Sequence, residues 1–152
     1  MLFYDRALAR GKVEFWLYDL RGLLKMHRIE RNMIVATGLT HLATRACSGD
    51  SVTKMNYIAI GSDNTPVTSG DTALGNETAR SSCDSNLASG SNWTLSANFA
   101  AGVGTGNVYE AAILNAAAAG DMLSRLVFGL FEKEAGDSLQ INWTIGFADD
   151  GV

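Results

Sequence analysis

The sequence predicts a mainly β protein, an antiparallel β-sandwich or jelly-roll-like domain with one short helix. Segments in which apolar and polar residues alternate recur at intervals of about 8 to 12 residues, the spacing expected of sandwiches and barrels. A helical spacing of apolar residues stands out in residues 37–47. The 152 residues include 16 glycines and one proline, which indicates a folded chain with many turns.

The amino-terminal part of the chain predicts a β-hairpin. Residues 13–19, VEFWLYD, alternate between two faces that both carry aromatic side chains. Residues 19–22 supply turn residues, and residues 23–30 resume an extended pattern. Residues 1–12 are either a short strand or a candidate N-terminal arm that orders against a neighbour. The predicted organisation is this arm, residues 1–12, followed by a single β-sandwich-like domain, residues 13–152.

The predicted helix covers residues 37–47. Leu39, Leu42, Ala43 and Ala46 are spaced three and four residues apart, and Ser48-Gly49 ends the run. Because this apolar stripe is narrow, we expect the helix to lie against the sheet.

A buried strand and a polar loop follow the helix. Residues 55–61 contain a short apolar run that leaves through Gly61 into a loop with the one proline, Pro66. Residues 78–84 are compatible with an edge strand, although little in their composition requires one.

The second half of the chain predicts four strands, at residues 93–99, 108–114, 122–131 and 139–147. In the first and last of them, every second residue is apolar. This pattern places Trp93, Trp143 and Phe147 on the face that points inward.

Composition and motifs argue against several function classes. The net charge of −4 gives no electrostatic footprint for nucleic acid, and no segment approaches the length of a membrane span or resembles a signal peptide. His27 and His41 lie in no catalytic or metal-binding motif, and the carboxylates of the 62–71 loop do not follow the spacing of a calcium loop. Cys47 and Cys83 lack the spacing of a zinc site and are expected to be reduced thiols. We therefore expect no enzymatic activity, no cofactor and no metal.

Two charged residues stand among apolar neighbours in predicted strands. Glu110 lies within residues 108–114, and Arg125 lies within residues 122–131. A buried charge without a partner is costly, so the sequence predicts that Glu110 and Arg125 form a buried ion pair.

The order of several short segments resembles small virion structural proteins of tailed bacteriophages. The segments are NMIVATGL at 32–39, IAIG at 58–61 with the polar residues 62–65, DTAL at 71–74 with Glu77, EAAILN at 110–115, LSR at 123–125 with Phe128, and DSLQINWTI at 137–145. Each segment alone is weak, and it is their order that carries the resemblance.

The resemblance implies a non-enzymatic virion protein, of which a capsid decoration (cement) protein is the first interpretation. It implies a homo-oligomer, with a trimer favoured, that contacts the major capsid protein or another virion protein. The candidate interface comprises apolar and aromatic residues near the amino end and part of the loop after residue 61: Leu2, Phe3, Tyr4, Trp16, Asp63, Asn64, Thr65, Pro66 and Val67. The alternatives are a tail or fibre component and a carbohydrate-binding adhesin module, in which Trp93, Tyr109 or Trp143 would stack on sugar.

Overall fold

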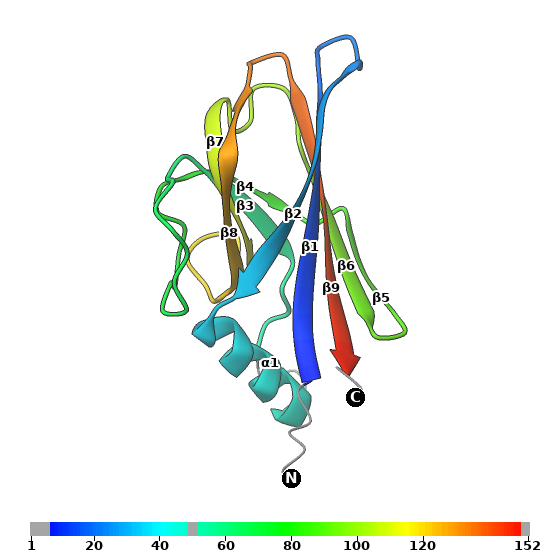
Figure 1. Ribbon diagram of the computed structural model, residues 1–152, viewed down its shortest axis with the longest axis vertical. Coiled ribbons are helices and arrows are strands. Elements are labelled where there is room, and N and C mark those ends of the chain that lie inside the picture. The colour runs from blue at the N-terminus through cyan, green and yellow to red at the C-terminus, as the bar shows by residue number, and fades with distance from the viewer. Residues whose placement is uncertain (1–6, 49–51, 150–152) are drawn as a thin grey trace.

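The computed structural model describes residues 7–48 and 52–149. In this part of the chain, nine antiparallel strands form one strongly curled sheet, and a single α-helix lies at one end of it (Figure 1). The elements are β1 (Ala7–Tyr18), β2 (Leu24–Ile34), α1 (Ala36–Ser48), β3 (Tyr57–Gly61), β4 (Glu77–Ser82), β5 (Ser85–Ser89), β6 (Asn92–Phe99), β7 (Gly106–Leu114), β8 (Met122–Lys133) and β9 (Ser138–Asp149).

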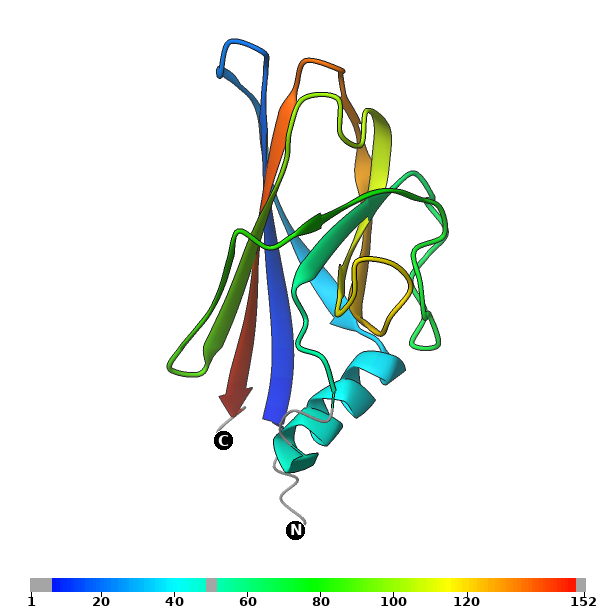
Figure 2. The same ribbon diagram turned by 180° about the vertical axis from the view of Figure 1, so that it is seen from behind.

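The sheet is continuous because β2 belongs to both of its halves. The strand order is β4-β3-β7-β8-β2-β1-β9-β6-β5. β2 pairs with β1 up to Asn32, and its last two residues, Met33 and Ile34, pair with β8. Figures 1 and 2 show β2 crossing diagonally from one half to the other. The prediction of a mainly β antiparallel domain with one short helix is confirmed, but the fold is a half-barrel of one curled sheet rather than a sandwich of two separate sheets.

The hydrophobic core fills the concave side of this sheet. Alternate residues of β1, β6 and β9 point into it, and Phe15, Phe99 and Trp143 are fully buried there. The ring of Phe15 lies 4.7 Å from that of Phe128, on the opposite half of the curl. The two halves of the sheet are therefore joined by packing as well as by β2.

Helix α1 packs against β8, as its narrow apolar stripe predicted. The backbone N–H of Val35 donates to the carbonyl of Leu123 at 3.1 Å, just before the helix begins. A Cβ atom at Gly38 would overlap that same carbonyl, so glycine permits the close approach of the helix to the strand.

Several predicted boundaries differ from the structure. β1 begins at Ala7, so residues 7–12 of the proposed arm are strand residues paired with β9, whereas Leu2, Phe3 and Tyr4 lie outside the described residues. β5 was not predicted from the sequence, because its Leu87 is 68% exposed and gives no buried face. Phe147 was predicted to point into the core, but it is 42% exposed, since the end of β9 extends past the packed core.

Candidate functional site

The guanidinium of Arg125 is the centre of a buried charge cluster. Its Nε donates to Glu110 Oε2 at 2.9 Å, Nη1 donates to Asp71 Oδ2 at 2.8 Å, and Nη2 donates to Asp63 Oδ2 at 3.0 Å. Glu110 is fully buried and Arg125 is 3% exposed. The predicted partners Glu110 and Arg125 are thus in contact, and the structure adds Asp63 and Asp71 to them. We call these four residues the Arg125 cluster.

Glu110 also anchors the chain that leads into β4. Its Oε2 accepts the backbone N–H of Gly75 at 2.9 Å, and its Oε1 accepts that of Asn76 at 2.8 Å. Gly61 lies beside the same carboxylate, and a Cβ atom at this position would overlap Glu110 Oε1. The buried carboxylate is therefore compensated by one cation and by backbone donors, as a buried charge requires.

The loop between β3 and β4, residues 62–76, is fixed by the two aspartates of the cluster. Asp63 accepts the backbone N–H of Thr65 at 3.2 Å and its hydroxyl at 3.0 Å. Asp71 accepts the backbone N–H of Thr68 at 3.1 Å and its hydroxyl at 2.6 Å. Each aspartate thus shapes a local turn while it binds Arg125, and the loop is joined to the core at both ends.

The contacts of the cluster shift the pKa values of Asp71 and Arg125. Burial acts to raise the pKa of Asp71, but hydrogen bonds from Thr68 and Arg125 outweigh it, so that the pKa lies below its ordinary value. For Arg125, burial acts to lower the pKa, and the bonds to Asp71 and Glu110 raise it overall. Both shifts favour the charged forms of Asp71 and Arg125.

The candidate interface residues fall into three groups. Asn64, Thr65 and Pro66 form the exposed tip of the loop. One carboxylate oxygen of Asp63 accepts a hydrogen bond from Arg125, and Val67 packs against the small core cluster beside β3. These two side chains therefore hold the loop in place and are less available to a partner.

Trp16, the remaining described member of the candidate interface, lies on the convex side of the sheet. It is half-buried, and its ring stacks on His27 at a centroid distance of 3.8 Å. His27 in turn lies 3.3 Å from a carboxylate oxygen of Glu14. This face therefore presents an aromatic pair far from the tip of the 62–76 loop in the sheet order.

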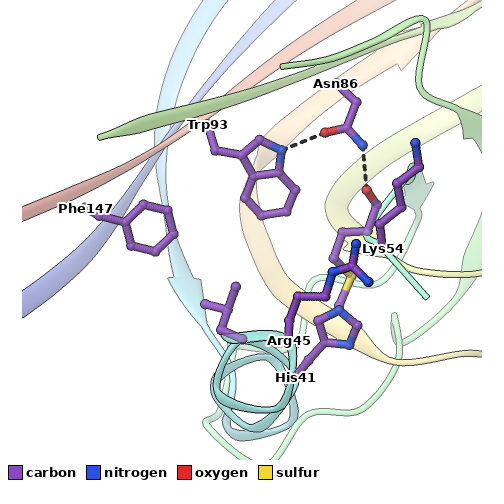
Figure 3. Close-up of a pocket in the computed structure, with 8 residues that line it drawn as sticks. His41, Arg45, Lys54, Asn86, Trp93 and Phe147 are labelled. Carbon is purple, nitrogen blue, oxygen red and sulfur yellow. Dashed lines mark hydrogen bonds between the residues drawn. The ribbon is translucent and has the colours of Figure 1, made fainter. Parts of the chain in front are cut away.

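A pocket of about 350 Å³ opens between α1 and the β5–β6–β9 edge of the sheet (Figure 3). We call it the α1 pocket. Trp93 was predicted to point into the core; it packs against the core cluster but is only half-buried and also lines this pocket, because the first fully buried residue of β6 is Leu95, two positions further along. The residues that line it are His41, Leu42, Arg45, Lys54, Met55, Asn86, Trp93 and Phe147.

Hydrogen bonds fix the polar side of the pocket. The indole N–H of Trp93 donates to Asn86 Oδ1 at 2.7 Å, and the amide of Asn86 donates to the Met55 carbonyl at 2.8 Å and to Asn56 Oδ1 at 3.0 Å. On the helix side, Arg45 Nη1 donates to the Val52 carbonyl at 2.9 Å. The pocket is therefore a fixed hollow with aromatic walls and basic residues beside them.

Among the described residues, no group of three or more His, Cys, Asp or Glu side chains is arranged to hold a metal ion. His41, which is 5% exposed, lies 3.4 Å from Asp121 Oδ2. Burial raises the pKa of the Cys83 thiol to about 11, which disfavours the reactive thiolate at neutral pH.

In the described part of the chain, α1 is too short to cross a membrane. Comparison of the chain with protein families, with curated proteins and with solved structures gives no match.

Proposed function

We propose that this chain is a non-enzymatic structural protein of a tailed bacteriophage virion, and specifically a capsid decoration (cement) protein. It would bind copies of itself and the major capsid protein, and it would be assembled into virions in the host cytoplasm. The resemblance of the ordered sequence segments supplies the class of protein, and one structural feature supports a role in protein contacts.

That feature is the 62–76 loop, held in one shape by the Arg125 cluster. A loop of this length without helix or strand is uncommon in a compact domain unless it has a function. Asp63 and Asp71, both bound to Arg125, hold the base of the loop, and the tip carries small polar residues and a proline. A preorganised tip loses little conformational entropy when a partner binds, which suits a contact surface.

The copy number in purified virions tests this proposal and distinguishes a capsid decoration protein from a tail or fibre component. Quantitative mass spectrometry should find the protein at hundreds of copies per particle if it covers the capsid. A handful of copies would indicate a tail or fibre component, and absence from the particle would overturn the virion role.

A loop-tip variant tests whether this loop makes the contact. Asn64→Arg adds bulk and charge at an exposed position and should lower incorporation into virions without changing the melting temperature. Ala88→Arg, on the exposed edge strand β5, is the matched control. Equal incorporation of both variants would exclude the loop tip as the contact.

A carbohydrate-binding module is the second candidate, because Trp93 lines a pocket as well as packing against the core. Its indole N–H and the amide of Asn86 are, however, already bonded within the protein. Sugar recognition needs polar groups that face the ligand as well as an aromatic surface. A glycan array would support this candidate if binding were lost in Trp93→Ala.

A further inference from the structure

A second hollow lies on the convex face of the sheet, across β6, β9, β1 and β2, which are neighbouring strands (Figure 1). Its volume is about 370 Å³, within the range of about 300–1,000 Å³ that small-ligand pockets have. The residues that line it are Arg10, Gly11, Lys12, Ile29, Arg31, Asn92, Thr144 and Gly146. We call it the Arg31 hollow.

The hollow exists because Gly146 has no side chain. Gly146 lies between Arg10 of β1 and Asn92 of β6, its direct partners in the two neighbouring strands. The residue before it, Ile145, is fully buried in the core, so residue 146 belongs to the convex face. A Cβ atom at Gly146 would lie 3.1 Å from Asn92 Oδ1, so the Asn92 amide stands over the glycine. The sequence thus leaves a gap in a row of side chains and places a polar amide at its edge.

Positive charge is concentrated at this hollow. Among the described residues that line it, three are cations and none is an acid, although the chain as a whole carries a net charge of −4. Lys12 and Arg31 are direct partners in β1 and β2, and like charges placed opposite each other are destabilising. Glu14, the next residue of β1 on this face, pairs with Lys12, and Arg10 is already engaged within the chain. Arg31 is therefore the cation most available to an anion.

Hydrogen-bond donors border the same space. In the part of the chain that the structure describes, no residue bonds to the Arg31 guanidinium or to the side-chain amide of Asn92. Thr144, the partner of Lys12 in β9, adds a hydroxyl that lies 3.4 Å from the hydroxyl of Thr94. A guanidinium and an ammonium side by side suit a phosphate or sulfate group, which presents more acceptor oxygens than a carboxylate does.

The two ends of the hollow differ in chemistry. Lys12 and Arg31 supply charge at the β1–β2 end, whereas Asn92 and Thr144 at the β6–β9 end are neutral and can both donate and accept. From β2 to β6 there are three strand spacings, about 14 Å. An inorganic anion would meet the charged end alone. A ligand in which an oxyanion is joined to a group with hydroxyls would meet both ends and fill the space over Gly146.

We propose that the Arg31 hollow binds a small sugar phosphate or sugar sulfate, with the oxyanion between Lys12 and Arg31 and the sugar hydroxyls against Asn92 and Thr144. The site is separate from the α1 pocket and from Trp93, the aromatic residue of the second candidate function. This inference goes beyond the proposed function and does not depend on it, because the copy number in virions says nothing about a small ligand.

NMR titration of the full chain at low and constant ionic strength tests the proposal. Glucose 6-phosphate should shift the signals of the hollow residues and bind at least about tenfold more tightly than inorganic phosphate or glucose, since neither of these meets both ends. Glucose 6-sulfate in the same titration shows which oxyanion the site prefers, and binding of either ester supports the proposal.

Three variants separate a built site from diffuse charge. Arg31→Gln should weaken binding of glucose 6-phosphate at least about tenfold without lowering the melting temperature, because it removes a like-charge contact. Arg21→Gln, which removes an exposed cation at the turn between β1 and β2, is the matched control and should bind as wild type does. Gly146→Val keeps every charge but fills the hollow, so it should weaken glucose 6-phosphate more than inorganic phosphate.

Two results would overturn the proposal. If glucose 6-phosphate binds no more tightly than inorganic phosphate and Gly146→Val changes neither, the hollow holds an adventitious ion only. If Arg21→Gln and Arg31→Gln weaken binding equally, the net charge of the protein explains the binding and the hollow is not a site.

Discussion

The guanidinium of Arg125 binds carboxylates from two separate segments, the 62–76 loop and β7. The sequence shows that Glu110 and Arg125 stand among apolar residues, and this was enough to predict their pairing. The sequence gives no sign that Asp63 and Asp71 also bind Arg125. They lie 62 and 54 residues before it, in a loop where aspartate is a common residue. Only the folded chain brings these two acids to the cation, so the loop anchors could not be found from spacing.

The first prediction concerns the removal of this cation. Arg125→Met leaves Glu110 buried and without its cation, and we expect it to lower the free energy of unfolding by about 3–5 kcal/mol. Adding Glu110→Gln should recover only part of this loss, because a glutamine cannot accept all the backbone N–H bonds that Glu110 accepts. Urea unfolding of the wild type, Arg125→Met, Glu110→Gln and the double variant measures these losses of stability.

Comparison of the single and double variants shows whether Glu110 and Arg125 stabilise each other or contribute independently. The double variant should lose less stability than the sum of the two single losses, by about 0.5–3 kcal/mol. Arg21→Met, in the exposed Asp19–Arg21 pair, serves as the control and should change the urea midpoint little. Strictly additive losses would show that Glu110 and Arg125 do not stabilise each other.

The second prediction concerns pH. The pKa of Asp71 is lowered in the folded state, so its contribution to stability is complete above the unfolded pKa of about 3.9 and is lost as pH falls through the lower folded value. The difference in urea midpoint between wild type and Asp71→Asn should therefore be largest near pH 7 and shrink below pH of about 4. A difference that stays constant with pH would contradict the role of the ionised carboxylate.

Helix α1 illustrates how one element depends on close backbone contact. Gly38 lies inside the helix, where alanine ordinarily stabilises by about 0.5–1 kcal/mol. Here a Cβ atom would overlap the carbonyl of Leu123, so the helix would have to move away from β8. The pattern of apolar residues predicted the helix and its contact with the sheet, but it gave no sign of this glycine's role.

The third prediction reverses the usual sign of a glycine-to-alanine change. Gly38→Ala should destabilise the protein by about 1–3 kcal/mol, as overpacking does. Gly70→Ala, at a loop position with open space around it, is the matched control and should stay within about 0.5 kcal/mol of wild type. Thermal and urea unfolding check both, and a stabilised Gly38→Ala would show that α1 can shift on β8 at no cost.

Strand periodicity predicted the middle of the strands better than their ends. In β9, Leu139, Ile141, Trp143 and Ile145 are fully buried, as alternation requires, whereas Phe147 is exposed at the pocket. The alternation continues past the point where the core stops, so the pattern alone cannot locate that point. For residues 7–12 the sequence left a short strand and an arm as alternatives, and the structure places them in the sheet through backbone pairing with β9 and packing of Ala9 against the core.

At the scale of the whole molecule, the curl of the sheet depends on the place where β2 leaves β1 for β8. Asn32 lies at this junction, and its Oδ1 accepts the indole N–H of Trp143 at 3.0 Å. Its amide donates to Ser124 Oγ, which in turn donates to the Met33 carbonyl at 2.8 Å. One side chain therefore joins β2, β8 and β9. The sequence places Asn32 in the segment before the helix but cannot show that this segment belongs to two halves of a sheet.

The fourth prediction tests this junction through Gly11, the residue of β1 that faces Asn32. A Cβ atom at Gly11 would overlap the Asn32 amide, so Gly11→Ala should displace that side chain and leave the indole N–H of Trp143 without its acceptor. An unsatisfied buried donor costs about 1–3 kcal/mol, and the loss should appear in urea unfolding and as faster hydrogen exchange of the Trp143 indole. In an Asn32→Ala background, the overlap and the acceptor are both already gone, so Gly11→Ala should add little further loss. If Gly11→Ala costs the same in both backgrounds, the strain lies in the β1 backbone, and Asn32 is not what holds the two halves of the sheet at their junction.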